Sequence, residues 1–177
     1  MPEYIITHSK KLLDPVNPDK DSILIEDIAH ALSMICRANG QLPIFFSVAQ
    51  HSILCCREAM ARGLSKKICL ACLLHDASES YMADIIRPVK KNLDAYIKIE
   101  KKLQDTVYEK FVGTLSESER ITVAEIDDAM LYQEFFILMG EKLSEELPIK
   151  THPEFITLDF ATVEKEFIML YNKLSDK

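Results

Sequence analysis

The sequence predicts an all-α protein, a bundle of about six helices. Apolar residues recur at helical spacing in six long segments, and no segment of comparable length alternates between polar and apolar residues as a strand does. The 177 residues include only 4 glycines and 7 prolines, which argues against a loop-rich β fold. The length fits one domain, residues 1–177, and no repeat or low-complexity segment divides it.

The chain should begin with an irregular arm and a first amphipathic helix. Residues 1–21 contain three prolines and are expected to form the arm, with a short strand at residues 4–7. The first helix is expected at residues 25–38, where an apolar residue returns every three or four positions. Asn39 and Gly40 should close it, because glycine accepts the left-handed turn that ends many helices.

The next two helices are expected at residues 47–62, closed by Gly63, and at residues 65–80, where Ser65 can act as the N-cap. The second of these is very apolar, so it should be buried. Pro88 must break helical structure beyond it, because proline lacks the backbone donor that a helix interior needs.

Three further helices complete the prediction. One is expected at residues 94–111 and ends at Gly113. Ser116-x-x-Glu119 is a capping box that opens a long helix at residues 116–139. A proline-containing loop then leads to the last helix, at residues 159–174.

Composition and charge limit the classes of partner. The net charge of −7 disfavours a nucleic-acid polymer, since no basic stripe is present to neutralise its phosphates. No N-terminal stretch has the order of a signal peptide, and no apolar run approaches membrane-spanning length. A cytoplasmic protein without a membrane partner is therefore expected.

The five cysteines all lie in apolar, helix-like segments. Cys69 and Cys72 form a C-x-x-C pair, which invites a zinc or redox interpretation. No second cysteine or histidine pair follows, and free cysteine behaves as a small apolar residue. Buried packing is the expected role of the pair.

His75 and Asp76 follow an apolar run, and an ionised carboxylate carried inward costs several kcal/mol unless a cation or donor meets it. His51 and Asp127 lie in two other predicted helices, with Asp128 as the alternative to Asp127. Two imidazoles and two carboxylates form a mixed donor set suited to one divalent ion of Mn, Fe, Co, Ni or Zn, with Mg possible. Taken singly, each histidine is more often a hydrogen-bonded core residue than a ligand.

The order His51, His75-Asp76, Asp127 resembles the metal signature of the HD-domain phosphohydrolase superfamily. The stretch from His75 to Lys90 is similar to the H-D-A-x-E-x-x-x-x-D-x-x-x-P-x-K segment of its small members that act on deoxynucleotides. These include bacterial 5′-deoxynucleotidases and phage dATP triphosphohydrolases. The resemblance covers residues 22–140, and Ile126 stands where many relatives have alanine.

The resemblance implies a role for each matching residue. Glu79, one helical turn after His75, would orient or deprotonate the attacking water, and Asp84 would be the acid to the leaving group or the partner of Glu79. Both have ordinary alternatives, since Glu79 could pair with a lysine and Asp84 could begin a turn. Phosphate would be bound by Arg37, Arg87 and Lys90; the last two could also belong to a solvated turn. The four implied ligands of one divalent transition metal are His51, His75, Asp76 and Asp127.

The implied function is metal-dependent removal of phosphate from nucleotides, as a 5′-nucleotidase or a deoxynucleotide triphosphohydrolase in which a metal-bound water attacks. The alternative is a non-catalytic nucleotide-binding domain with a regulatory role, but such domains lose motif residues that are all present here. A diiron oxygenase would need ligands for a second metal that His30 alone could not supply. Small members are commonly oligomeric, so a homo-oligomer is expected by analogy.

Overall fold

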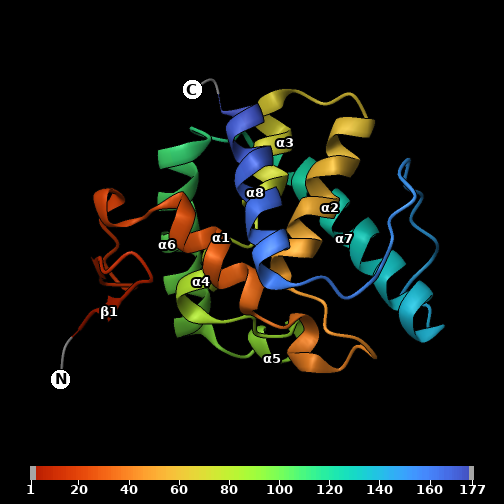
Figure 1. Ribbon diagram of the computed structural model, residues 1–177, viewed down its shortest axis with the longest axis horizontal. Helices are drawn as coiled ribbons and strands as arrows, with labels where there is room; N and C mark the ends of the chain where they lie inside the picture. Colours follow the sequence, from red (N-terminus) through yellow and green to blue (C-terminus); the bar gives the residue numbers. More distant parts are fainter. Residues whose placement is uncertain (1–2, 176–177) are drawn as a thin grey trace.

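The computed structural model describes residues 3–175, and nearly all of its regular structure is helical (Figure 1). The predicted all-α class is confirmed. Residues 1–2, which belong to the expected arm, and residues 176–177, at the end of the predicted domain, lie outside the described part. The α-helices are α1 (Ile25–Met34), α2 (Val48–Ala61), α3 (Lys66–Leu73), α4 (Glu79–Met82), α5 (Arg87–Lys90), α6 (Asp94–Phe111), α7 (Glu117–Met139) and α8 (Phe160–Leu174).

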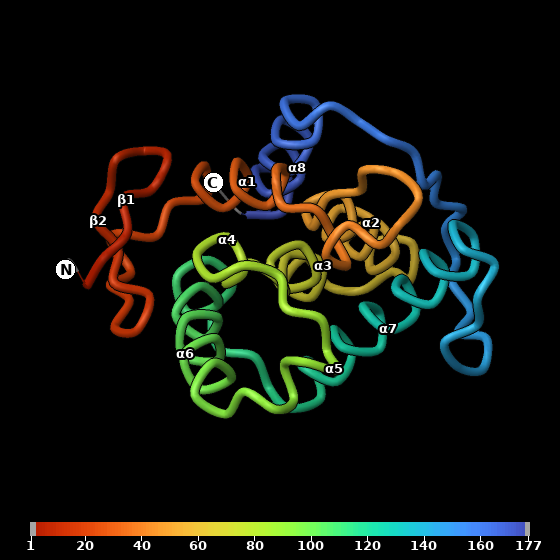
Figure 2. The backbone as a smooth tube through the Cα atoms, turned by 90° about the horizontal axis from the view of Figure 1, so that it is seen from below, coloured from red at the N-terminus to blue at the C-terminus, as the bar shows by residue number. Residues whose placement is uncertain are grey.

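The N-terminal arm is a small hairpin at one end of the molecule (Figure 2). The expected short strand is present as β1 (Ile5–Ile6), and it pairs antiparallel with β2 (Leu12–Leu13), a strand that the sequence did not predict. Leu13 is fully buried, so the hairpin is attached to the core by its second strand. A 3-10 turn, η1 (Lys20–Ser22), leads from the hairpin to α1.

Helix α3 lies near the middle of the bundle, with α2, α7 and α8 packed around it (Figure 2). Its apolar residues from Cys69 to Leu73 are buried as expected, and Cys69 and Cys72 are free thiols. Because α3 packs between α2 and α7, residues of these three helices lie close together. None of the helices within residues 3–175 has the length and apolar character needed to cross a bilayer.

The first helix ends at Met34, four residues earlier than predicted. Ile35 turns into extended backbone because its carbonyl accepts from Val48 N at 3.1 Å, and Arg37 N donates to Phe46 O at 2.9 Å. This pairing with the start of α2 replaces the last helical turn. It places Arg37 in a short 3-10 segment, η2 (Arg37–Gly40).

The third helix is also shorter than predicted, because α3 ends at Leu73 and residues 74–78 run as turns before α4. Gln104 of α6 stabilises this turn with both the nitrogen and the oxygen of its side-chain amide. Its Nε2 donates to Leu74 O at 2.7 Å, and its Oε1 accepts from Ser78 N at 3.0 Å. The chain therefore leaves the helix just before His75.

The predicted break before residue 91 is present, but the break comes at Ala83 rather than at Pro88. Two single-turn helices, α4 and α5, flank it. Pro88 lies in the first turn of α5, where a missing backbone donor costs nothing.

Glu58 attaches α2, the helix that carries His51, to the chain between α7 and α8. Its buried carboxylate accepts from Arg62 Nε at 2.7 Å, Thr151 Oγ1 at 2.7 Å, Thr151 N at 2.9 Å and Lys150 N at 2.9 Å. Burial alone would raise the pKa of Glu58, but these donors together lower it below its ordinary value.

We expect Glu58→Gln to lower the free energy of unfolding by about 2 kcal/mol at pH 7, because donors lose their charged acceptor. A lowered folded-state pKa means that this contribution is present above the unfolded value of about 4.3 and is lost as pH falls through the folded value. Urea denaturation should thus show a difference between the two proteins that shrinks in acid. Glu125→Gln, at an exposed position of α7, is the control, and an equal effect of both variants would contradict the prediction.

Candidate metal centre

Three helices bring four potential ligands together. His51 lies in the first turn of α2, which Ser47 opens with a capping box, and its side chain is fully buried. His75 and Asp76 follow the end of α3, and Asp127 lies in the middle of α7. Since α2, α3 and α7 pack against one another, these side chains converge.

The separations between the ligand atoms are short. His51 Nε2 lies 3.0 Å from Asp127 Oδ1, 3.2 Å from His75 Nε2 and 4.0 Å from Asp76 Oδ2. His75 Nε2 lies 3.2 Å from Asp76 Oδ2 and 3.6 Å from Asp127 Oδ1. Around one ion with bonds of about 2.1 Å, octahedral neighbours lie about 3.0 Å apart and opposite ligands about 4.2 Å apart. The observed separations, 3.0 to 4.0 Å, lie in the range expected between ligands of one ion.

Hydrogen bonds on the far sides of the rings orient both histidines. His75 Nδ1 lies 2.8 Å from Cys72 O, a carbonyl that can only accept, so Nδ1 carries the proton. His51 Nδ1 lies 2.5 Å from Glu134 Oε1 and donates to that carboxylate. In the neutral rings, each Nε2 therefore presents a lone pair to the same point.

The protonation of His75 depends on the carboxylates that surround it. Burial alone would lower the pKa of His75, but the carboxylates of Asp76 and Asp127 raise it well above its ordinary value. A proton on His75 Nε2 and a metal ion would thus compete for one position. The surroundings favour positive charge there, whichever cation supplies it.

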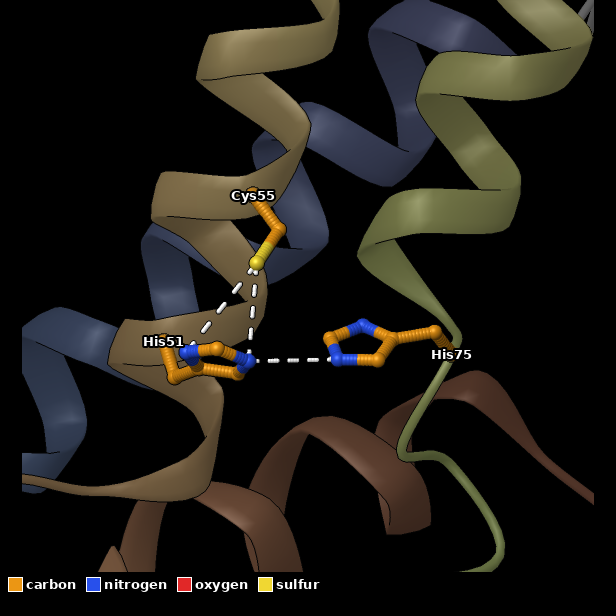
Figure 3. Close-up of side chains that lie close together, drawn as sticks. All are labelled: His51, Cys55 and His75. Carbon is orange, nitrogen blue, oxygen red and sulfur yellow. Dashed lines mark hydrogen bonds between the residues drawn. The ribbon is translucent and has the colours of Figure 1, made fainter. Parts of the chain in front are cut away.

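Cys55 is a further member of the cluster, and the sequence did not indicate it (Figure 3). Its Sγ lies 3.5 Å from His51 Nε2, and one ligand atom of each of His51, Cys55 and His75 lies within 4.8 Å of the others, so the three could hold a metal ion. Burial first, and then the charge of Asp127, raises the pKa of the thiol well above its ordinary value. The available signal was its position four residues after His51, which puts both on one face of a helix.

Arg37 lies against the carboxylates of the cluster. Its Nε donates to Glu134 at 2.7 Å, and its two terminal nitrogens lie 3.5 Å from Asp76 and 3.8 Å from Asp127. Burial would lower its pKa, but the charges of Glu134 and the two aspartates raise it. The predicted phosphate-binding arginine is thus buried at the edge of the centre, with its guanidinium facing the ligand atoms.

A cavity of about 290 Å³ opens beside the centre. Glu79 lines it together with His75 and Asp76, although the helix expected to connect them is absent. Glu79 Oε2 is buried without a hydrogen-bond partner, and burial, with the nearby charges of Asp76 and Asp84, raises the pKa of Glu79 to about 10. The full lining is His75, Asp76, Ser78, Glu79, Lys90, Ile97, Glu100, Lys101, Gln104, Asp105 and Arg120.

The remaining predicted site residues lie around the metal centre and its cavity. Arg87 binds the two neighbouring aspartates of α7, with Nη2 2.6 Å from Asp127 Oδ2 and Nη1 2.5 Å from Asp128 Oδ1. Asp128 is half-exposed, whereas Asp127 Oδ1 lies 3.0 Å from His51 Nε2, so Asp127 is the aspartate that faces the histidines. Lys90 Nζ donates to Glu100 at 2.7 Å and lies 3.7 Å from Glu79.

Asp84 does not line the cavity; its Oδ2 accepts from Ala38 N at 3.2 Å. This bond stabilises η2, in which Ala38 and Asn39 adopt left-handed backbone angles (φ of 53° and 51°) that cost non-glycine residues energy. Asp84 thereby helps to position the segment that carries Arg37. The charge of Asp84 also helps to raise the pKa of Glu79.

Fold and site together describe an all-α protein with a largely buried histidine–cysteine cluster, next to carboxylates, that could hold a metal ion. No protein-family model matches the chain. The chain is similar to the uncharacterized protein YfdR of Escherichia coli, with 41% identity over 110 residues that cover 61% of this chain and 58% of the relative. It is also similar to an uncharacterized protein of Rhodobacter capsulatus, with 39% identity over 109 residues, 58% of this chain and 55% of the relative. The matched region thus spans little more than half the length of these curated relatives.

Proposed function

We propose that the protein is a metal-dependent phosphohydrolase of the HD-domain type that removes phosphate from deoxynucleotides. The observation that supports it most is the convergence of four ligand atoms, from His51, His75, Asp76 and Asp127, beside a cavity that also contains Glu79. A divalent ion bound there would neutralise charge on a phosphate oxygen and make water more acidic.

We assign to Glu79 the role of orienting and deprotonating the attacking water molecule. Its unpartnered Oε2 would accept a hydrogen bond from a water in the cavity after a small rotation of the carboxylate, and a buried carboxylate gains from such a bond. A cation next to Asp76 would offset one of the negative charges that raise the pKa of Glu79, so the ionised form would become more accessible. Glu79 would then orient that water and take its proton.

Basic side chains around the cavity would bind the phosphate group. Lys90, Lys101 and Arg120 line it, and Lys90 would exchange its bond to Glu100 for a phosphate oxygen. Arg37 and Arg87 contact the aspartates beside it and would offset the charge that a phosphate brings. Positioning and charge neutralisation account for most catalysis of phosphoryl transfer, which this set of residues can supply.

The direct test is a screen of the purified protein, loaded with Mn²⁺ or Co²⁺, against all deoxynucleoside mono- and triphosphates, with products resolved by chromatography. A 5′-nucleotidase would release nucleoside and orthophosphate from a monophosphate. A triphosphohydrolase would release nucleoside and triphosphate. If bound metal is verified and no nucleotide yields product, the proposal fails and a nucleotide-binding domain becomes the better description.

Glu79→Ala should retain bound metal but lower turnover by about 100-fold or more, the usual size of a general-base contribution. Metal content by mass spectrometry and the rate of phosphate release measure the two effects separately. Glu125→Ala, at an exposed carboxylate on α7, should change neither. Loss of metal from Glu79→Ala would contradict the role assigned here.

We also expect the protein to associate with itself. The end of α7 exposes Phe136, Ile137 and Met139, whereas Phe135 and Leu138 pack on the core. Apolar residues grouped on a surface in this way are typical of subunit contacts. Sedimentation of the wild type against Ile137→Lys tests the expectation.

A further inference from the structure

The centre contains two kinds of donor that share the same pair of histidines. Asp76 and Asp127 offer carboxylate oxygens, which suit hard ions such as Mn²⁺ and Mg²⁺. Cys55 offers sulfur, which suits Zn²⁺, Cd²⁺ and Co²⁺. Figure 3 shows Cys55 and His51 on α2, with the ring of His75 facing them. An ion bound to these two histidines could therefore have either hard oxygen ligands or a soft sulfur ligand.

The separation between the sulfur of Cys55 and Nε2 of His51 is that of two ligands of one ion, and because Sγ also lies 4.0 Å from Nδ1, the Cys55 side chain must turn toward the lone pair of Nε2 to bind. An ion about 2.3 Å from sulfur and about 2.1 Å from nitrogen, in tetrahedral geometry, separates those two ligand atoms by about 3.6 Å. The observed distance from Cys55 Sγ to His51 Nε2 is 3.5 Å. Because Glu134 binds His51 Nδ1, the nitrogen close to sulfur is also the one that is free to bind metal.

Cys55 differs from the other cysteines in its proximity to the histidines. Of the five cysteines, which all lie within residues 3–175, it alone belongs to a group of potential ligands. Cys56 is the next residue on α2 and is equally buried, but a helix directs consecutive side chains to different sides. Cys56 is therefore a matched control for any effect of removing a buried thiol from α2.

We propose that Cys55 gives the centre a second mode of metal binding, in which a thiophilic divalent ion is held by His51, His75 and the Cys55 sulfur. The thiol releases its proton to solvent when the sulfur binds. Hard ions would use Asp76 and Asp127 and leave the thiol protonated. The inference rests on the metal centre of the proposed function but assigns it a selectivity that hydrolysis does not require.

Cobalt provides a spectroscopic test on the full chain. Co²⁺ in the wild type should give visible d–d bands together with an intense near-ultraviolet band from sulfur-to-cobalt charge transfer. Cys56→Ser should give both, whereas Cys55→Ser and Cys55→Ala should keep the d–d bands and lose the charge-transfer band. In Cys55→Ser the affinity for Cd²⁺ should fall by about tenfold or more, and that for Mn²⁺, followed by electron paramagnetic resonance, should stay within about twofold.

The outcomes separate the two proposals. Visible bands without a sulfur band in the wild type, or a sulfur band that persists in Cys55→Ser, overturn the role of Cys55 and leave the hydrolase untouched. Complete absence of cobalt bands in the wild type overturns the metal centre itself. If the Cys55 variants do not fold, as judged by circular dichroism, comparison of the wild-type sulfur band with that of Cys56→Ser still decides the question: its absence from the wild type rejects sulfur ligation, and its presence in both supports it.

Discussion

Asp76→Ala is expected to reduce bound Mn²⁺ to background and to lower nucleotide hydrolysis to the rate without protein. Asp76 is one of two anionic donors, with Oδ2 3.2 Å from His75 Nε2. Burial would raise the pKa of Asp76, but the neighbouring His75 lowers it far below its ordinary value, so the carboxylate is ionised at neutral pH. Its removal leaves one anionic ligand beside two neutral imidazoles, which bind a hard ion poorly.

Metal content by mass spectrometry and product release by chromatography test this expectation. Asp128→Ala is the matched control, because it removes a carboxylate that contacts Arg87 but lies away from the histidines. Cd²⁺ binding should survive Asp76→Ala better than Mn²⁺ binding, since the sulfur of Cys55 does not depend on Asp76. Retention of both Mn²⁺ and activity in Asp76→Ala would rule out the proposed centre.

Glu134→Ala should be among the most destabilising single substitutions, with a loss of about 3–5 kcal/mol in the free energy of unfolding. Glu134 is fully buried and binds Arg37 Nε through one oxygen and His51 Nδ1 through the other. Without it, the buried guanidinium loses its nearest counter-charge. Removal of one partner of a buried ion pair is costly because the other charge stays behind.

Urea denaturation measures the loss in the free energy of unfolding. The variant Glu134→Gln separates the effect of lost packing from that of lost charge. The glutamine keeps an oxygen that can accept from His51 but removes the negative charge, so the protein should be more stable than Glu134→Ala. Its metal affinity should still fall by about 10- to 100-fold, as is usual when the carboxylate behind a ligating histidine is lost. An alanine variant as stable as the wild type would show that Arg37 and Glu134 do not form a coupled pair.

Much of the helical pattern could be read from local signals. The capping box of Ser116 and Glu119 and the apolar spacing that follows predicted α7, and the structure contains both bonds of the box. The last helix begins one residue after the predicted start, with Asp159 as its cap. Such signals suffice because helical hydrogen bonds and side-chain spacing involve residues only three or four positions apart.

Helix ends at the centre could not be predicted in the same way. The third helix stops before His75 because Gln104, thirty residues later, binds both Leu74 and Ser78. The first helix stops early because Ile35 pairs with the start of α2. Nothing in the local sequence marks either interaction, because the partners approach only after the helices have packed.

The sequence by itself determined the helical class and a short set of candidate ligands, since residue type and spacing carry that information. Only the tertiary structure decided that Asp127 rather than Asp128 faces the histidines, that Arg37 is enclosed by carboxylates, and which of the five cysteines lies within reach of a shared ion. These choices depend on how α2, α3 and α7 are rotated against one another. That rotation is set by the packing of the whole core, which no single segment of the chain encodes.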